Sequence, residues 1–196
     1  MAKDLNKVLV IDLEATCWDS DPPPGQKNEI IEIGLCVLDL KTGEREKHGR
    51  LVKPVESRVS EFCTSLTTIT QEMVDSEGIS LQDALHWLNE FKPRKRAWAS
   101  WGDYDRVQFD RECQRKALTV PFGRTHLNIK HLFAVMTGLS REIGVGQALE
   151  KVNTTFEGTP HRGADDAWNI AGIYARILGV GDESRIPETR VRKSGA

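Results

Sequence analysis

An apolar strand that ends in two acidic residues constrains this chain more than any other feature of its sequence. Residues 8–15 read VLVIDLEA, and the alternation of a strand places Asp12 and Glu14 on the same face as Val8 and Val10. Two like charges beside a hydrophobic core are unfavourable unless a cation or a proton compensates them. Three interpretations follow: the carboxylates bind a metal ion, they act as an acid/base pair, or the strand has already emerged into water.

The order of the predicted elements indicates an α/β fold. Apolar runs within residues 8–54 predict three antiparallel strands, the last two joined by the turn LKTGE. An irregular segment, 57–80, leads to an amphipathic helix that begins after Ser80 and ends before Pro93. We then predict strands at 97–102 and 125–129 and helices at 105–117, 130–138, 144–152 and 163–179. This order predicts a sheet that mixes antiparallel and parallel strands and is flanked by helices.

Length and charge limit the kinds of protein this chain can be. Its 196 residues are enough for one globular domain, which we place at residues 1–180, and the polar tail at 181–196 is expected to be flexible. The net charge of -2 argues against a bulk electrostatic hold on nucleic acid. The four cysteines form no CxxC pair and no apolar run could span a membrane, so we predict a cytoplasmic protein with no membrane partner.

Two later segments carry acidic doublets, and helical periodicity predicts which member of each faces the core. Asp166 lies in register with the isoleucines of its helix, whereas Asp165 lies in register with polar positions and is expected to face water. By the same argument Asp105 faces inward and Asp103 does not. Acidic residues at helix N-termini often serve only as caps and dipole partners. Together with the two carboxylates of the first strand, however, they would form a cage suited to two hard divalent cations, which favours the metal interpretation.

His161 precedes Asp166 by five residues, in the loop TPHRG. A single histidine in a loop is usually a surface residue. Beside an acidic metal site it becomes a candidate general base, because an ordinary imidazole has a pKa near 6.5 and can accept a proton at neutral pH.

Four motifs taken together resemble a known family: DLEATC, FCTSLTTITQEMVD, WGDYDRVQF and HRGADDAWNIA. They are similar to the DEDDh 3′-to-5′ exonucleases, and within these to the branch of the histone-mRNA 3′-exonuclease and the enhancer-of-RNAi proteins. The resemblance covers about residues 6–180. It implies a ribonuclease H-like fold with a central mixed five-stranded sheet, and it implies hydrolysis of single-stranded or 3′-overhang RNA, with DNA as a second substrate class, to nucleoside 5′-monophosphates.

The resemblance also implies roles for individual residues. The family's metal ligands match Asp12, Glu14, Asp105 and Asp166, and its catalytic histidine matches His161. Two Mg²⁺ or Mn²⁺ ions roughly 3.5–4 Å apart would then activate a water and stabilise the in-line displacement at phosphorus, while the histidine takes the proton of the water.

For substrate binding, the family pattern places the terminal base against aromatic side chains, here Phe62 and Tyr104, by stacking that tolerates any base. Leu66 and Thr67 would line the terminal nucleotide, and the backbone after Ala15 would approach its ribose. Thr68 stands where the family has glycine, so a positive φ at this position would strain the loop.

Other features have less specific interpretations. We expect Trp18, Trp98, Trp101 and Trp168 to be packing residues. The basic run KPRKR at 92–96 and Arg124 could guide a phosphate backbone, although such a run is more often a solvated surface. Two rival functions remain: a DNA proofreading exonuclease, and a binding module that retains the acids without catalysis. The sequence assigns no protein partner.

Overall fold

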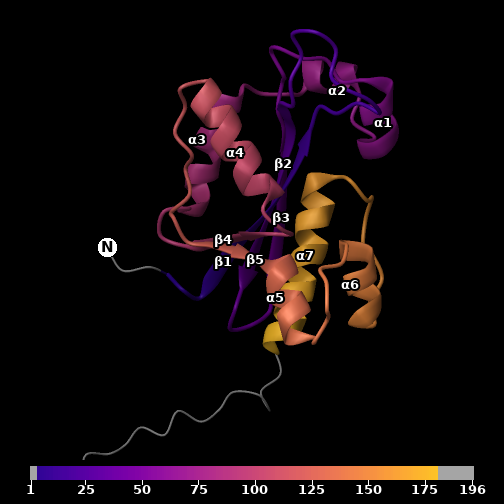
Figure 1. The fold of residues 1–196 in the computed structure, drawn as a ribbon. Coiled ribbons are helices and arrows are strands. Elements are labelled where there is room, and N and C mark those ends of the chain that lie inside the picture. The colour runs from indigo at the N-terminus through magenta and orange to yellow at the C-terminus, as the bar shows by residue number, and fades with distance from the viewer. Residues whose placement is uncertain (1–3, 181–196) are drawn as a thin grey trace, which may run out of the picture.

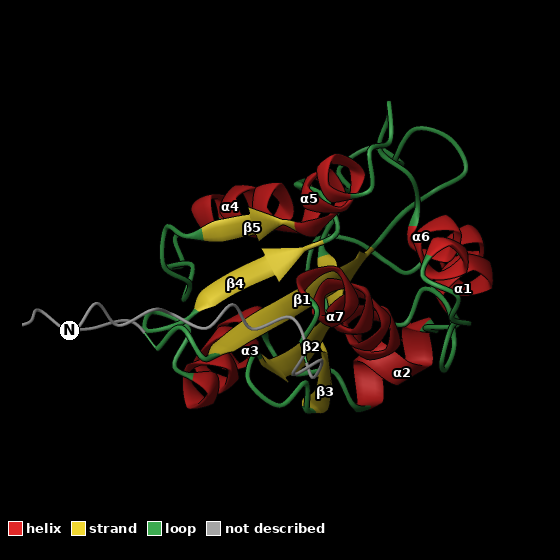
Figure 2. Ribbon diagram, turned by 90° about the horizontal axis from the view of Figure 1, so that it is seen from below, coloured by secondary structure: helices red, strands yellow, loops and turns green. Residues whose placement is uncertain are grey.

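A computed structural model describes residues 4–180, and its centre is one five-stranded sheet. The strands lie in the order β3-β2-β1-β4-β5, as Figure 2 shows. β1 pairs antiparallel with β2, and β2 with β3, whereas β4 runs parallel to β1 and β5 parallel to β4. The strand bounds are β1 Lys7–Ala15, β2 Ile30–Asp39, β3 Arg45–Leu51, β4 Ala97–Ser100 and β5 His126–Asn128. The mixed sheet confirms the prediction, while the tail at 181–196 lies outside the described residues.

The two faces of β1 build two separate cores, as its alternation requires. Leu9, Ile11 and Leu13 join a core on one face, and Val8 and Val10 join a core on the other. Asp12 and Glu14 follow the second pair, so the carboxylates continue the Val8 face at the end of the strand.

Helices cover both faces of the sheet, and Figure 1 shows α3 and α4 on one side of it and α5, α6 and α7 on the other. Within residues 4–180 there are seven α-helices: α1 Glu61–Thr67, α2 Gln71–Ser76, α3 Leu81–Leu88, α4 Tyr104–Arg115, α5 Ile129–Met136, α6 Val145–Lys151 and α7 Gly163–Leu178. Ser80 caps α3 through its side chain, as predicted. None of these helices is both long and apolar enough to cross a bilayer.

Three of the four predicted packing tryptophans lie in or against the cores, whereas Trp18 is half-buried and belongs to none of them. Trp98 is 3% exposed within the core beneath α3 and α4. Trp101 and Trp168 pack from the side against the core beneath α7. The packing interpretation is therefore confirmed for these three residues.

The segment 57–80, predicted to be irregular, instead contains α1 and α2. Both helices are short, and they bury only Cys63, Thr67 and Val74, so they leave no apolar periodicity in the sequence. The caps carry the missing signal: Ser60 accepts a hydrogen bond from the Cys63 amide and Thr70 accepts one from the Met73 amide. In Figure 1 both helices lie at the end of the sheet where β1 ends.

Thr68 ends α1 in a left-handed conformation, with φ 62° and ψ 0°. The strain expected at this position is therefore present, because a β-branched residue fits this region poorly. We expect Thr68→Gly to stabilise the protein by about 0.5–1 kcal/mol, since the relief of strain exceeds the added freedom of the unfolded chain. Urea unfolding measures the change. Ser65→Gly, within the same helix, is the matched control and should be destabilising by a similar amount, about 0.5–1 kcal/mol. A loss of stability in both variants would contradict the prediction.

Candidate active site

Three carboxylates from opposite ends of the chain converge at the end of β1. Asp12, Glu14 and Asp166 each present an oxygen, and these atoms lie within 4.8 Å of one another. Asp12 and Glu14 are two residues apart on β1, and Asp166 lies in the first turn of α7. The prediction that these three residues meet is confirmed.

Two glycines bring α7 close enough for this meeting. Gly34 on β2 pairs with Asp12 on β1, and the first residue of α7, Gly163, lies directly over it. A Cβ atom at Gly34 would lie 1.8 Å from the carbonyl carbon of Gly163, and one at Gly163 would lie 3.0 Å from the Asp12 carbonyl oxygen. No side chain fits between helix and sheet here. The first turn of α7 therefore packs directly against the backbone of β1 and β2.

Asp105 approaches the group from α4 but is not one of the three converging residues. Its side chain is 4% exposed, and its Oδ1 accepts a hydrogen bond from the Leu13 amide at 2.9 Å. The inward orientation predicted from helical phase is confirmed. One of its oxygens is thus already used to hold α4 against β1, and the charge of Asp105 raises the pKa of Asp12 after the larger effect of burial.

The acids strongly perturb one another's ionisation. Burial, followed by the charges of Asp166, Glu32 and Asp105, raises the pKa of Glu14 to about 8. Burial is also the main cause that raises the pKa of Asp166 and of Asp105 to about 6 and that raises the pKa of Asp12 well above its ordinary value. Such a cluster is most stable with a proton or a cation between its members.

The residues present fit a hard divalent cation. Every donor in the cluster is a carboxylate oxygen, the ligand type that Mg²⁺ and Mn²⁺ prefer. In addition, Oδ2 of Asp166 is buried and has no hydrogen-bond partner among the described residues. Because a buried carboxylate oxygen normally has a partner, this atom points to a ligand that the polypeptide itself does not supply.

Asp165 does not face water, contrary to the prediction. Its side chain accepts hydrogen bonds from Lys47 Nζ at 2.7 Å and from the Thr159 amide at 2.9 Å. The periodicity of α7 places Asp165 away from the isoleucine row, as expected, but β3 and the loop before α7 cover that side of the helix. Asp165 is therefore a partly buried anchor, separate from the converging acids.

His161 lies in the loop just before α7, where its side chain is exposed. Its backbone is left-handed, with φ 58°, a conformation that histidine adopts more readily than most residues. Its charge lowers the pKa of Asp166, against the larger effect of burial. The imidazole thus lies on the solvent side of the acidic group.

Two residues beside the site were missed by the sequence reasoning. Glu32 on β2 lies directly opposite Glu14, is 4% exposed and accepts hydrogen bonds from the Arg162 side chain. The signal was present in EIIEIG, where a single acid interrupts an apolar strand as Asp12 does in β1. Its partner is 130 residues away and could not be inferred from spacing.

The predicted substrate residues fall into two groups. Phe62, Leu66 and Tyr104 are 40%, 39% and 54% exposed, so their side chains are accessible to a ligand. Partial burial, followed by the charges of Asp105, Cys17 and Glu14, raises the pKa of the Tyr104 hydroxyl to about 12.

Thr67 and Ala15 differ from this first group, because both are buried. The Thr67 hydroxyl donates to the Cys63 carbonyl and accepts from the Ile69 amide, so it supports the end of α1 rather than an open surface.

The basic run 92–96 lies far from the acids. It precedes β4, whose first residue, Ala97, pairs with Val8 near the start of β1. Six residues of strand separate Val8 from Glu14, a distance of roughly 20 Å. A role for this run in guiding a phosphate backbone stays a prediction.

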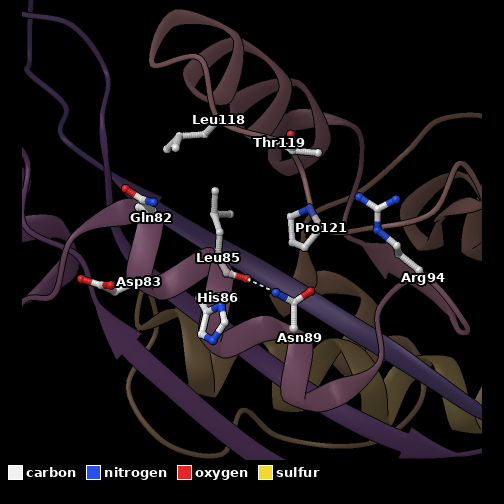
Figure 3. A pocket seen from close by; sticks show the side chains of 9 residues that line it. All are labelled: Gln82, Asp83, Leu85, His86, Asn89, Arg94, Leu118, Thr119 and Pro121. Atoms are coloured by element: carbon white, nitrogen blue, oxygen red, sulfur yellow. Dashed lines mark hydrogen bonds between the residues drawn. The ribbon is translucent and has the colours of Figure 1, made fainter.

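A cavity of about 540 Å³ between α3 and the loop after α4 is not a second candidate for catalysis (Figure 3). Leu85 and Leu118 contribute apolar side chains to its lining, and the Asn89 side-chain amide donates a hydrogen bond to the Leu85 carbonyl. His86 and Asp83 point away from one another in Figure 3 rather than towards a common point. No group of carboxylates or histidines converges there among the described residues.

The raised pKa of Glu14 predicts how the metal-free protein responds to pH. An acid whose pKa rises on folding, here from 4.5 to about 8, binds more protons in the folded state between these values. Folding stability in EDTA should therefore fall as the pH rises across that range. We expect Glu14→Gln to stabilise the metal-free protein by on the order of 2 kcal/mol at pH 8 and to have little effect below pH 4.5. Urea unfolding at several pH values measures this difference, with the exposed Glu150→Gln as control. An equal gain in stability from Glu14→Gln at pH 8 and below pH 4.5 would contradict the raised pKa of Glu14.

Comparisons with known proteins agree with this geometry. The profile of the Exonuclease (RNase_T) family matches residues 9–174. The chain is 33% identical to the Drosophila melanogaster 3′-5′ exonuclease Snipper, over 87% of this chain and 69% of that protein. It is 34% identical to Homo sapiens 3′-5′ exoribonuclease 1, over 92% of this chain but only 55% of that protein, so it spans about half the length of this relative.

Solved structures give the same result. The nuclease domain of 3′hExo, a DEDDh family member bound to rAMP, superposes with a TM-score of 0.80 at 29% identity, over 91% of this chain and 94% of that one. A 3′-exonuclease that recognises the 3′ end of the histone mRNA stem-loop superposes with a TM-score of 0.78 at 29% identity, over 89% and 82%. With its ribonuclease H-like fold and its converging acids, the chain belongs to the DEDDh 3′-5′ exonuclease family.

Proposed function

We propose that the chain is a metal-dependent 3′-to-5′ exonuclease that shortens single-stranded RNA or RNA with a 3′ overhang and releases nucleoside 5′-monophosphates. The observation that carries this proposal is the convergence of Asp12, Glu14 and Asp166, with a buried Asp166 oxygen left unpartnered within the described residues. Asp105, whose charge acts on Asp12, is the fourth acid of the set to which we assign two ions.

Each residue has a distinct task in this proposal. Asp12, Glu14, Asp105 and Asp166 hold two Mg²⁺ or Mn²⁺ ions, which supply Lewis acidity at the scissile phosphate when bound. His161, on the solvent side of the acids, takes the proton of the attacking water as an imidazole and later releases it to solvent. Arg162 and Gly163 fix the start of α7, so that Asp166 and the loop carrying the histidine keep their relative positions.

The exposed apolar side chains beside the acids support a terminal-nucleotide pocket. Phe62 and Leu66 are four residues apart on α1 and therefore share a face, and Tyr104 begins α4 next to Asp105. Aromatic rings stack on any base, which suits an enzyme that tolerates sequence, and each stacked base contributes about 1–3 kcal/mol. We include Ala15 and Thr67 in the proposal as the buried backbone and side-chain support of this pocket.

The preferred location of the protein follows from its cysteines. All four are free thiols, and three of them are buried. Unpaired buried thiols suit a reducing compartment, so the proposal includes a cytoplasmic location, which cell fractionation can check.

The proposal is tested by a degradation series on strands labelled at either end. We expect single-nucleotide shortening of 5′-labelled RNA and immediate release of label from 3′-labelled RNA, and both should stop in EDTA and resume with Mg²⁺ or Mn²⁺. The same series with DNA, duplexes and stem-loops measures substrate preference. Full activity in EDTA would contradict the metal-dependent mechanism.

The polarity of the reaction gives a separate prediction. A site that binds the terminal nucleotide through its free 3′-hydroxyl, as we propose, cannot accept a 3′-phosphate, so a 3′-phosphate should block hydrolysis while a 5′-phosphate should not. A circular single strand should be resistant. Cleavage of the circle at the rate of the linear strand would show an endonuclease instead.

A further inference from the structure

Glu32 is buried and forms a two-pronged ion pair with the half-buried Arg162, which the proposed chemistry does not use directly. Arg162 Nη2 lies 2.9 Å from Glu32 Oε1, and Arg162 Nε lies 3.1 Å from Glu32 Oε2. The Gly163 amide donates to the same Oε2 at 2.8 Å. Glu32 is 4% exposed, so it has lost its hydration and gains three N–H donors in return.

This pair holds the junction between the histidine loop and α7. Arg162 is the N-cap of α7 but offers no side-chain cap, so the carboxylate of Glu32 fulfils that role for Gly163 from a neighbouring strand. The carbonyl of Arg162 accepts hydrogen bonds from the amides of Asp165 and Asp166, at 2.8 and 2.9 Å. His161 comes immediately before, in its left-handed conformation. A shift of Arg162 would therefore alter the position of the histidine relative to Asp166.

The pair also keeps a fifth acid out of the converging group. Glu32 lies opposite Glu14 on the same face of the sheet, yet it is not among the three carboxylates that meet. Both of its oxygens are engaged by the planar fork of Arg162, a geometry that lysine could not reproduce.

We propose that Glu32 and Arg162 are positioning residues, which set the relative placement of His161 and Asp166 for catalysis; this inference rests on the proposed nuclease function. The simpler alternative is an anchor that only stabilises α7. Arg45 supplies the matched control, because it anchors the middle of the same helix: its Nη1 donates to the Trp168 carbonyl at 2.9 Å and its guanidinium lies 3.8 Å from the centre of the Trp168 ring.

The test compares Glu32→Ala, Arg162→Ala and Arg45→Ala in the full chain with Mn²⁺ and single-stranded RNA. For the first two variants we expect kcat to fall about 10–100-fold with KM nearly unchanged, as for other residues that orient a metal site. For Arg45→Ala we expect lower thermal stability but a wild-type kcat. Glu32→Gln, which keeps the volume of the side chain, serves as a second variant should Glu32→Ala fail to fold.

Chemical rescue separates positioning from general stability. A cavity of about 380 Å³ is lined by both Glu32 and Arg162, so a small cation can reach the pair from solvent. We expect millimolar guanidinium to restore part of kcat to Arg162→Ala. The double variant Glu32→Ala/Arg162→Ala lacks the partner and should not respond. A wild-type kcat in both single variants, or an equal response of the double variant to guanidinium, would overturn the proposal.

A readout without activity keeps the inference separate from the proposed function. Amide hydrogen exchange of the peptide spanning 161–166 should accelerate in Glu32→Ala, which loses the acceptor of the Gly163 amide, and in Arg162→Ala, which loses the two bonds that hold the Glu32 carboxylate in place. It should stay unchanged in Arg45→Ala. If wild-type protein degrades no substrate, the proposed function fails and this exchange decides whether the pair holds the junction. If wild-type protein is active but the exchange does not change, the positioning role fails alone.

Discussion

Replacement of Asp166 by asparagine is expected to lower the rate of RNA hydrolysis by about 10³–10⁴-fold or more, because a lost ligand removes several kcal/mol of transition-state stabilisation. Asparagine keeps the shape of the side chain and removes the negative charge from the converging group. The fold should survive, and the metal-free protein should be at least as stable as the wild type, since one of several repelling charges is gone. Single-turnover hydrolysis and calorimetric titration with Mn²⁺ measure the two effects.

The neighbouring acid is the control for this prediction. Asp165→Asn changes the same charge one residue earlier, but Asp165 bonds Lys47 and the Thr159 amide rather than the converging acids. We therefore expect it to reduce stability and to leave the affinity for Mn²⁺ close to that of the wild type. If Asp165→Asn and Asp166→Asn lose activity and metal affinity equally, Asp166 is not the member of the doublet that binds the metal in preference to Asp165.

The second large effect is expected from His161→Ala. A general base typically contributes about 10²–10⁴-fold, so kcat should fall on that scale while metal affinity stays near normal. A residual rate should remain, because the four acids are intact. Because alanine cannot accept a proton, the pH profile of kcat should differ between the wild type and the variant.

An exposed histidine elsewhere provides the comparison for His161. His131 on α5 is exposed and lies 3.1 Å from Glu142, and His131→Ala should retain both the rate and its pH dependence. Should His161→Ala keep the kcat of the wild type, or should weaker metal binding explain its whole loss, the histidine is not the base.

Local periodicity was sufficient to predict the acids, because each faces inward for a reason contained in its own element. A spacing of two in β1 places Asp12 beside Glu14, and helical phase selects Asp105 and Asp166 from their doublets. The fold class followed from the order of strands and helices. These inferences need no knowledge of what lies across the sheet.

Features that depend on contact between distant segments could not be predicted in this way. Asp165 is partly buried because β3 places Lys47 beside it, and no property of α7 reveals that strand. The Glu32–Arg162 pair joins β2 to the start of α7, and the contact of Gly34 with Gly163 is visible only once helix and sheet are assembled. Helices α1 and α2 were missed for a different reason, since helices of seven and six residues bury too few side chains to show a period.

Because the site joins β1 to α7, the order of synthesis limits when activity can appear. Three of the four acids leave the ribosome early, but the helix that carries Asp166 is made last among the described elements. At about 5–20 residues per second, the stretch between Asp12 and Asp166 takes roughly ten to thirty seconds to translate. A chain cut short before α7 would therefore lack Asp166 and is expected to lack the proposed activity. Conversely, α7 supplied as a separate fragment offers a way to switch the enzyme on by reassembly.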